Sequence, residues 1–323
     1  MLVFIIAWAF YGLFLLRDFL TLLMLSVTIS ILMDAPISHL SKKKVLRPIV
    51  TFFLYLIVFS LFFGSFALFL PIIVKEVGKI SNLYPDLFHS FQFIKHFSSF
   101  ENAKNFLFTF DKNSLQSFFE IFVSMFGGLT NFIIVIIIAF YLNMKQHAIE
   151  QMIEYVTPGK YESFIISHWT SFRKKVESWF HGQLLLSFLV FLFTLLGLSI
   201  LRIPYAFLLS LLAGIFGLIP YGILFAVIPA LILSFNAGGI KMLVIVSLLY
   251  AFTQQLVDYI IQPFISKRMT GIPPVAVIIS AIASTKLFGI VGLILAIPIA
   301  LFVMELFSAW EERDKSLKKY TSK

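Results

Sequence analysis

Residues 48–74 decide the class of fold, and they read PIVTFFLYLIVFSLFFGSFALFLPIIV without one charged side chain. A helix crosses the hydrocarbon of a bilayer with about 20 apolar residues at about 1.5 Å per residue. The stretches 129–144, 184–201 and 240–262 are apolar in the same way, and the last of them carries one acid, Asp258. The sequence therefore predicts an all-α, polytopic membrane protein.

The composition of the whole chain excludes several other classes of protein. Of its 323 residues, 60% are hydrophobic and only 13% are charged, whereas about 25% are charged in soluble domains. The 40 phenylalanines argue against disorder, and the lack of cysteine excludes a disulfide-stapled domain. The net charge of +9 does not indicate nucleic-acid binding, because Lys and Arg fill short gaps between apolar runs.

Two longer apolar stretches, 203–236 and 272–304, are interrupted by proline and glycine and predict two broken helical hairpins. Such interruptions survive at membrane depth only where protein or a watery cavity satisfies the freed backbone groups. Whether each hairpin spans the bilayer or re-enters it stays open. The predicted helix breaks are Gly217, Pro220, Gly222 and Pro229 in the first hairpin, and Gly289, Gly292 and Pro298 in the second.

The first 33 residues are apolar except for Arg17 and Asp18. They predict two short helices turned at that pair, with one long tilted helix as the alternative. Together with the spans and the hairpins, this gives about eight membrane segments.

The two hairpins are related by an internal repeat of 70 residues. An identical residue stands 70 positions after each of Pro204, Ala206, Ser210, Ala213, Gly222, Ala226 and Ala230. One span, 240–262, separates the hairpins, so the second enters from the opposite side, as in the inverted repeats of secondary transporters. The alternative is that these prolines and small residues only let helices pack closely.

The basic residues predict which side of the membrane each loop faces. Cytoplasmic loops carry an excess of Lys and Arg, and the basic clusters fall on one side if both termini are cytoplasmic. The clusters are Lys42, Lys43, Lys44 and Arg47, then Arg173, Lys174 and Lys175, then Lys267 and Arg268, and finally the tail.

These boundaries divide the chain into five predicted parts. They are N-terminal membrane helices (1–74), an extracytoplasmic helical domain (75–127), a membrane helix with a cytoplasmic amphipathic helix (128–183), a transport core with both hairpins (184–304) and a cytoplasmic tail (305–323).

The cytoplasmic region 145–183 contains one apolar helix face. Its apolar positions step by 4, 3, 4 and 3 residues along Ile165, Trp169, Phe172, Val176 and Trp179, which is the spacing of one side of an α-helix. A helix with such a stripe normally lies in the headgroup plane. We expect a linker helix resting on lipid, with a moving gate helix as the alternative.

Ionisable groups inside a membrane are costly, so each one marks a candidate functional site. Asp258 follows Gln254 and Gln255 in an otherwise apolar span, and Gln262 lies one turn further on. This strip is predicted to line a polar path or to bind a cation or proton; alternatively, Asp258 pairs with a basic residue of the following loop. Lys286, at the tip of the second hairpin, attracts an anionic group, neutralises Asp258 or snorkels to the outer interface.

The chain offers no residues that indicate enzyme chemistry. No pair of histidines has the spacing of metal ligands, so no metal site is predicted. No glycine-rich phosphate loop indicates ATP-driven transport, and no serine stands in a nucleophile elbow. We therefore expect neither an enzyme nor a cofactor, with Na⁺ or H⁺ as the coupling ion.

A set of short motifs runs in fixed order along nearly the whole chain. It begins with Asp34-Ala35-Pro36 and continues with Trp179-Phe180-His181-Gly182-Gln183, Gly217-Leu218-Ile219-Pro220-Tyr221-Gly222, Ile228-Pro229-Ala230, Gln255 and Asp258, Gln262-Pro263, Pro273-Pro274, Phe288-Gly289-Ile290-Val291-Gly292 and Ala296-Ile297-Pro298. This order and spacing resembles the autoinducer-2 exporter family of bacterial membrane proteins. One departure is Lys286, which stands where members usually have small or apolar residues.

The resemblance implies a homo-oligomeric transporter of the bacterial inner membrane with seven or eight membrane segments. Some members of the family are associated with efflux of the autoinducer-2 signal, and others are similar to sodium or lithium–proton antiporters. We therefore expect a secondary transporter that exports a small polar solute with a proton or sodium gradient. The alternatives are a sodium(lithium)/proton antiporter and a non-transporting scaffold that acts through the external domain. The expected partners are the lipid bilayer and the transported solute or ion, and not nucleic acid.

Overall fold

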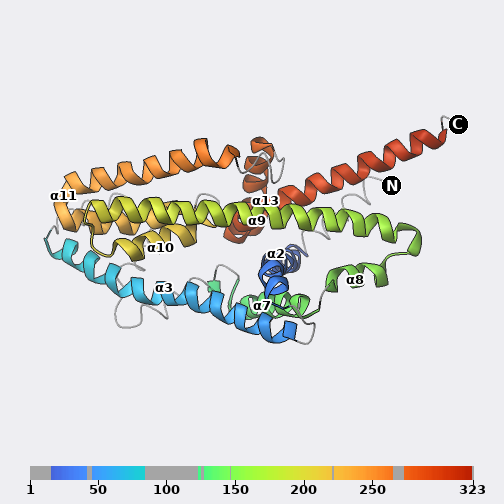
Figure 1. The fold of residues 1–323 in the computed structure, drawn as a ribbon, viewed down its shortest axis with the longest axis horizontal. Coiled ribbons are helices and arrows are strands. Elements are labelled where there is room, and N and C mark those ends of the chain that lie inside the picture. The colour runs from blue at the N-terminus through green and yellow to red at the C-terminus, as the bar shows by residue number, and fades with distance from the viewer. Residues whose placement is uncertain are drawn as a thin grey trace. The chain divides into compact units, whose positions relative to one another are not determined.

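The computed structural model describes residues 16–41, 46–83, 123–124, 127–145, 147–219, 222–264 and 273–321, which are almost entirely helical (Figure 1). The helices are α2 (Arg17–Leu40), α3 (Arg47–Leu83), α7 (Leu129–Met144), α8 (Ala148–Val156), α9 (Gly159–Ile200), α10 (Ala206–Gly217), α11 (Ile223–Gln255), the π-helix η3 (Leu256–Ile261) and α13 (Pro274–Thr321). The predicted all-α fold is confirmed.

Several helices in these ranges have the length and apolar composition of membrane spans. There are five of them, or six if α7 and α8, which meet at a bend of 91°, form one broken span. The prediction of a polytopic membrane protein is therefore confirmed, while the count of eight segments stays a prediction. The expected span 129–144 coincides with α7, which follows Gly128 in a left-handed conformation (φ 113°) and ends before the extended Lys145.

The chain divides into two compact units, which are described separately. Unit 1 contains α2, α3 as far as Leu56, α7, α8, α9 as far as Gly182, and α13. Unit 2 contains α3 from Ile57, α9 from Gln183, α10, α11 and η3. The first hairpin therefore belongs to unit 2 and the second to unit 1.

Two clusters of buried apolar side chains hold unit 1 together. The first consists of Leu25, Val135, Val291 and Leu295, and the second of Ile31, Phe172, Val176 and Leu301. These contacts join α2 and α13, which contribute to both clusters, to α7 in the first and to α9 in the second.

The apolar stripe of region 145–183 lies in this core from Trp169 to Trp179, which differs from the prediction, while Ile165 is exposed. Phe172 and Val176 pack against Ile31 of α2 and Leu301 of α13, so protein covers the stripe where lipid headgroups were expected. The stretch is also continuous with the next span, because α9 runs for 42 residues, or about 63 Å. That length is about twice the thickness of the hydrocarbon layer. The amphipathic spacing thus correctly predicted that this helix face is covered, but it did not reveal that protein, rather than lipid, covers it.

Unit 2 contains the first predicted hairpin, whose arms are α10 and the beginning of α11. The arms pack on each other through Ala213, Ala226 and Ala230, which are all fully buried. Small side chains let helices approach closely. Gly222 is needed at the turn, because a Cβ added there would lie 2.1 Å from the carbonyl oxygen of Phe216. Pro220 lies outside the described residues.

The second hairpin turns at Gly289, which has φ 63° and ψ −145°, a conformation that favours glycine. The hydroxyl of Ser280 donates a hydrogen bond of 2.6 Å to the carbonyl oxygen of Ala296. In a straight helix these two residues would lie about 24 Å apart, so α13 folds back on itself. Gly292 allows the close approach, because a Cβ added there would lie 1.9 Å from the carbonyl oxygen of Ser284.

Three of the predicted helix breaks do not interrupt a helix, and one of these is Gly292, which lies in the helical part of α13 after the turn at Gly289. Pro229 lies inside α11 and Pro298 inside α13, and the helices continue past both. A proline removes one backbone hydrogen bond and bends a helix without having to end it. A break that was not predicted occurs instead at Gly238 and Gly239, where Gly239 has φ 63° and ψ −154°.

The N-terminal and external segments are described only in part. α2 begins at Arg17, where the sequence predicted a turn between helices, and residues 1–15 lie outside the described ranges. α3 continues through Pro71 to Leu83, past the predicted end of its span at residue 74. Residues 84–122 of the predicted external domain lie outside the described ranges as well.

Candidate functional site

The predicted polar strip lies where α11 passes into the π-helix η3. The side-chain amide of Gln254 donates a hydrogen bond of 2.8 Å to Oδ2 of Asp258, which is half-buried. The two residues therefore share a helix face, as their spacing predicted, whereas Gln255 and Gln262 are exposed. π-helical turns inside α-helices are frequent at functional sites.

Of the basic residues that were predicted to interact with Asp258, the structure describes only Lys286. Lys267 and Arg268 lie outside the described residues, and among the residues that are described no cation pairs with Asp258. Lys286 is exposed, three residues before the turn at Gly289. Its role toward an anion or toward Asp258 stays a prediction.

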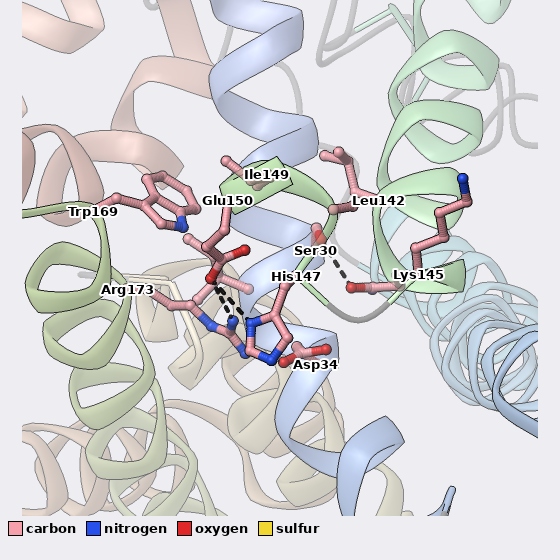
Figure 2. Close-up of a pocket in the computed structure, with 12 residues that line it drawn as sticks. Ser30, Asp34, Leu142, Lys145, His147, Ile149, Glu150, Trp169 and Arg173 are labelled. Atoms are coloured by element: carbon pink, nitrogen blue, oxygen red, sulfur yellow. Dashed lines mark hydrogen bonds and ion pairs between the residues drawn. The ribbon is translucent and has the colours of Figure 1, made fainter. Parts of the chain in front are cut away.

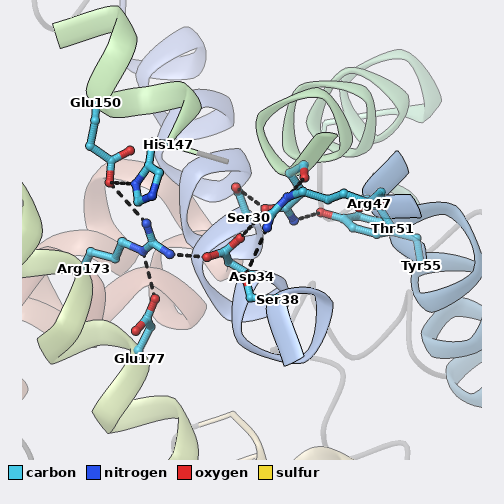
Figure 3. A network of polar contacts seen from close by, with 11 residues as sticks. Ser30, Asp34, Ser38, Arg47, Thr51, Tyr55, His147, Glu150, Arg173 and Glu177 are labelled. Carbon is cyan, nitrogen blue, oxygen red and sulfur yellow. Dashed lines mark hydrogen bonds and ion pairs between the residues drawn. The ribbon is translucent and has the colours of Figure 1, made fainter. Parts of the chain in front are cut away.

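A larger polar network, which the sequence analysis did not identify, is built around Asp34 in unit 1. Asp34 lies on α2 between two guanidinium groups, with Arg47 bound to one carboxylate oxygen and Arg173 to the other (Figure 3). Its side chain is 14% exposed, and those of Arg47 and Arg173 are 6% and 22% exposed. Charge-assisted hydrogen bonds of this kind are among the strongest in proteins.

The Arg47 side of the network ties three helices together. Nε of Arg47 donates to the carbonyl oxygen of Asn143 at 2.8 Å, and Nη1 donates to the Ser38 hydroxyl at 3.2 Å. The Asn143 side chain accepts from Ser30 at 2.8 Å and donates to the Tyr55 hydroxyl at 3.0 Å. Because α2, α3 and α7 all contribute, Arg47 is fixed in place from several directions.

The Arg173 side carries two more carboxylates. Nε of Arg173 donates to Glu177 on the same helix at 2.9 Å, and Nη1 donates to Glu150 of α8 at 3.2 Å. His147 lies 3.5 Å from the same Glu150 oxygen. Arg173 therefore binds three acids at once, which the fork of donors in a guanidinium permits.

A small pocket opens beside Asp34 and Arg173 (Figure 2). Ser30, Asn143, Glu150 and Trp169 also line it. Its volume is about 20 Å³, which is enough for a single water molecule, and the pocket is partly open. The Trp169 Nε1 donor is buried and has no hydrogen-bond partner among the described residues.

A second charged cluster in unit 1 joins α13 to α9. Glu305 of α13, whose side chain is 8% exposed, accepts from Lys175 at 2.6 Å and from the Ser171 hydroxyl at 3.1 Å. Nδ1 of His168 lies 2.8 Å from the other oxygen of Glu305. The three partners occupy one face of α9, so this cluster fixes the position of the arm after the second hairpin.

A further polar contact in unit 2 joins α3 to the kink in α11. The side chain of Asn236 donates to the buried Glu76 carboxylate at 2.8 Å and to the Glu76 carbonyl oxygen at 3.0 Å. Asn236 lies two residues before the break at Gly238. The contact therefore fixes α11 where its helical hydrogen bonds are interrupted.

One available signal pointed to the network that the sequence analysis missed. Asp34 is an acid at the end of a mostly apolar stretch, and such acids are functional candidates. Arg47 and Arg173 were counted only as charges that orient loops. Sequence spacing could not predict that the two arginines contact Asp34, because they lie 13 and 139 residues from it.

Within the described ranges, no three His, Asp or Glu side chains are grouped as a metal site requires.

Comparison with known proteins shows similarity to transport proteins over most of the chain. The family model described as "AI-2E family transporter" matches residues 2–312. A protein of Bacillus subtilis (strain 168) provisionally named transport protein YueF is 26% identical over 292 residues, covering 84% of this chain and 79% of its own length. A provisionally named transport protein of Thermotoga maritima is 25% identical over 302 residues and covers 90% of each chain.

Proposed function

Because this chain belongs to the AI-2E family of transporters, we propose that it is a secondary transporter that exports a small polar solute, such as an autoinducer-2-like signal, with a proton or sodium gradient. The transport names of the two relatives support the class but specify no solute. Assembly from several copies, a bacterial inner-membrane location and cytoplasmic termini are parts of the same proposal.

The observation that carries the proposal is the carboxylate of Asp258. It lies in a membrane-length helix, Ile223–Phe264, and is half-buried in a π-helical turn. A charged group at such a position is costly and is normally retained for function. Its hydrogen-bond partner among the described residues is the neutral amide of Gln254.

This arrangement differs from that of two other acids that lie in the interior, Asp34 and Glu305. Asp34 is neutralised by two guanidinium groups, and Glu305 is bound to Lys175 and His168. Asp258 has no such cation among the residues described. A carboxylate within a membrane-length helix is a candidate to bind a proton or a cation, and we assign the coupling role to Asp258.

A sodium(lithium)/proton antiporter is the second candidate function, and the same observation favours it. A carboxylate that binds a proton in one state and Na⁺ in another exchanges the two ions without an organic solute.

The two candidates are separated by flux measurements on liposomes that contain the purified protein and a pH-sensitive dye inside. Transport of autoinducer-2 that requires an imposed proton or sodium gradient supports the exporter. Proton movement on addition of Na⁺ or Li⁺ alone supports the antiporter. If neither flux exceeds that of protein-free liposomes, the transport proposal fails and the scaffold alternative is favoured.

A further inference from the structure

The pocket beside Asp34 has the features of a hydrated site. It has room for about one water molecule, polar groups line it, and the buried Trp169 Nε1 donor lacks a partner among the described residues. Indole N–H groups only donate, so the missing partner is an acceptor oxygen. A bound anion is disfavoured by the carboxylates of Asp34 and Glu150, and a cation by the guanidinium of Arg173.

The ion pair between Asp34 and Arg173 can open without leaving a buried charge alone. If it breaks, Asp34 keeps Arg47 as its partner, and Arg173 keeps Glu150 and Glu177. Removing the sole partner of a buried charge costs about 3–5 kcal/mol, and this arrangement avoids that cost. The network therefore offers two states in which every charge is paired.

The two arginines are not equivalent in this respect. Arg47 is almost fully buried and is held by Asn143 and Ser38 as well as by Asp34. Arg173 is more exposed, and its remaining partners are the two carboxylates. The contact of Asp34 with Arg173 is consequently the one that opens at lower cost.

We propose that the pocket is the narrow end of a water-filled path through unit 1, and that the ion pair between Asp34 and Arg173 is the gate beside it. The proposal rests on the transport function inferred above, and it assigns Arg173 a positioning role in that function. Opening the gate enlarges the one-water pocket until a small hydrophilic molecule enters it.

The chain contains no cysteine, so a single introduced thiol reports access to the pocket. Ser30 lines the pocket, is buried, and differs from cysteine by one atom. The probe is an uncharged, sugar-bearing methanethiosulfonate reagent, which is larger than the pocket and which the loss of the Arg173 charge does not itself attract. It is added to the full-length Ser30→Cys protein in lipid nanodiscs, and the reaction rate is measured by mass spectrometry.

The gate variant is Arg173→Gln, and the matched control is Lys174→Gln, which removes the same charge from the next, exposed residue of α9. We expect Arg173→Gln to speed the reaction of Ser30→Cys by about tenfold, as for a lost contact of roughly 1.4 kcal/mol. Lys174→Gln leaves the rate unchanged. Ser26→Cys, one helical turn away and fully buried, stays unreactive in every background.

Equal Ser30→Cys rates in the Arg173→Gln and Lys174→Gln backgrounds overturn the gate. If Arg173→Gln does not yield a monodisperse protein, Arg173→Lys keeps the charge but loses the forked hydrogen bonds, and we expect an intermediate rate. A rate equal to that of the Lys174→Gln control again overturns the proposal. Because labelling needs neither gradient nor solute, rapid labelling without any flux overturns the transport function alone.

Discussion

At the scale of single residues, the second hairpin depends on the missing side chain of Gly292. A Cβ at this position would lie 1.9 Å from the Ser284 carbonyl oxygen, so the two arms of α13 would have to separate. We predict that Gly292→Ala lowers the free energy of unfolding by about 1–3 kcal/mol, as overpacking does in other cores. Thermal melting of the purified protein in detergent measures the effect.

Gly64→Ala is the matched control for this substitution. Gly64 also lies in a helix, α3, but a Cβ added there meets nothing within 4 Å. Alanine is favoured over glycine inside a helix by about 0.5–1 kcal/mol, so this variant melts at the same or a higher temperature. Equal melting temperatures for Gly292→Ala and the parent would show that the arms are not held this closely.

The residues of the site were predictable only where the contact is local. Gln254 and Asp258 are four residues apart, so their hydrogen bond followed from helix geometry. Asp34 and Arg173 are separated by 139 residues, and no spacing rule joins them. Glu305 and Lys175 were missed for the same reason, because their contact depends on how α13 packs against α9.

At the scale of elements, the charged cluster around Glu305 fixes α13 to α9. We predict that Glu305→Gln removes the charge that Lys175 and His168 bind and costs about 1.5–3 kcal/mol, the range for hydrogen bonds to charged groups. Hydrogen–deuterium exchange of backbone amides over residues 300–312 should become faster as this part of α13 loosens.

Glu312→Gln provides the comparison for that prediction. Glu312 lies 3.4 Å from the other nitrogen of His168, but its side chain is 71% exposed. Exposed ion pairs contribute about 0–1 kcal/mol, so exchange over the same residues stays close to that of the parent. Equal acceleration by both substitutions would mean that the buried cluster does not hold α13.

The elements themselves were predictable where one physical cause dominates. The apolar run 129–144 became the 16-residue helix α7, which has the length of a membrane span only together with α8, across a bend of 91°. The turn at Gly289 followed from its sequence context, whereas Pro229 and Pro298 showed that a proline bends a helix more readily than it ends one. The stripe at Phe172 and Val176 was assigned to lipid because spacing does not reveal a protein neighbour.

At the scale of the whole molecule, the two hairpins share one structural device. Gly222 and Gly292 correspond under the 70-residue repeat, and at both a Cβ would collide with a carbonyl oxygen of the preceding arm, that of Phe216 or of Ser284. An internal repeat would produce this equivalence. The repeat does not by itself show that the hairpins enter the membrane from opposite sides. That prediction requires the two turns to face opposite sides of the membrane.

We predict that the two turns are labelled from opposite sides. Single cysteines replace Ile219 beside the first turn and Thr285 before the second, since the chain has none of its own. In right-side-out and inside-out vesicles, an impermeant maleimide is expected to reach Ile219→Cys from the cytoplasmic face and Thr285→Cys from the outer face. Labelling of both from one face would rule out an inverted repeat.

The central claim is that transport depends on the carboxylate of Asp258. The most direct test compares the flux of Asp258→Asn with that of the parent protein, with the same amount of each protein per liposome. The amide keeps the size of the side chain but carries no negative charge and takes up no proton in the physiological pH range. Glu154→Gln, which removes an exposed acid from α8, serves as the control. We predict gradient-dependent flux for the parent and for Glu154→Gln, and only the protein-free background for a folded Asp258→Asn. Flux by Asp258→Asn at the parental rate would contradict the account.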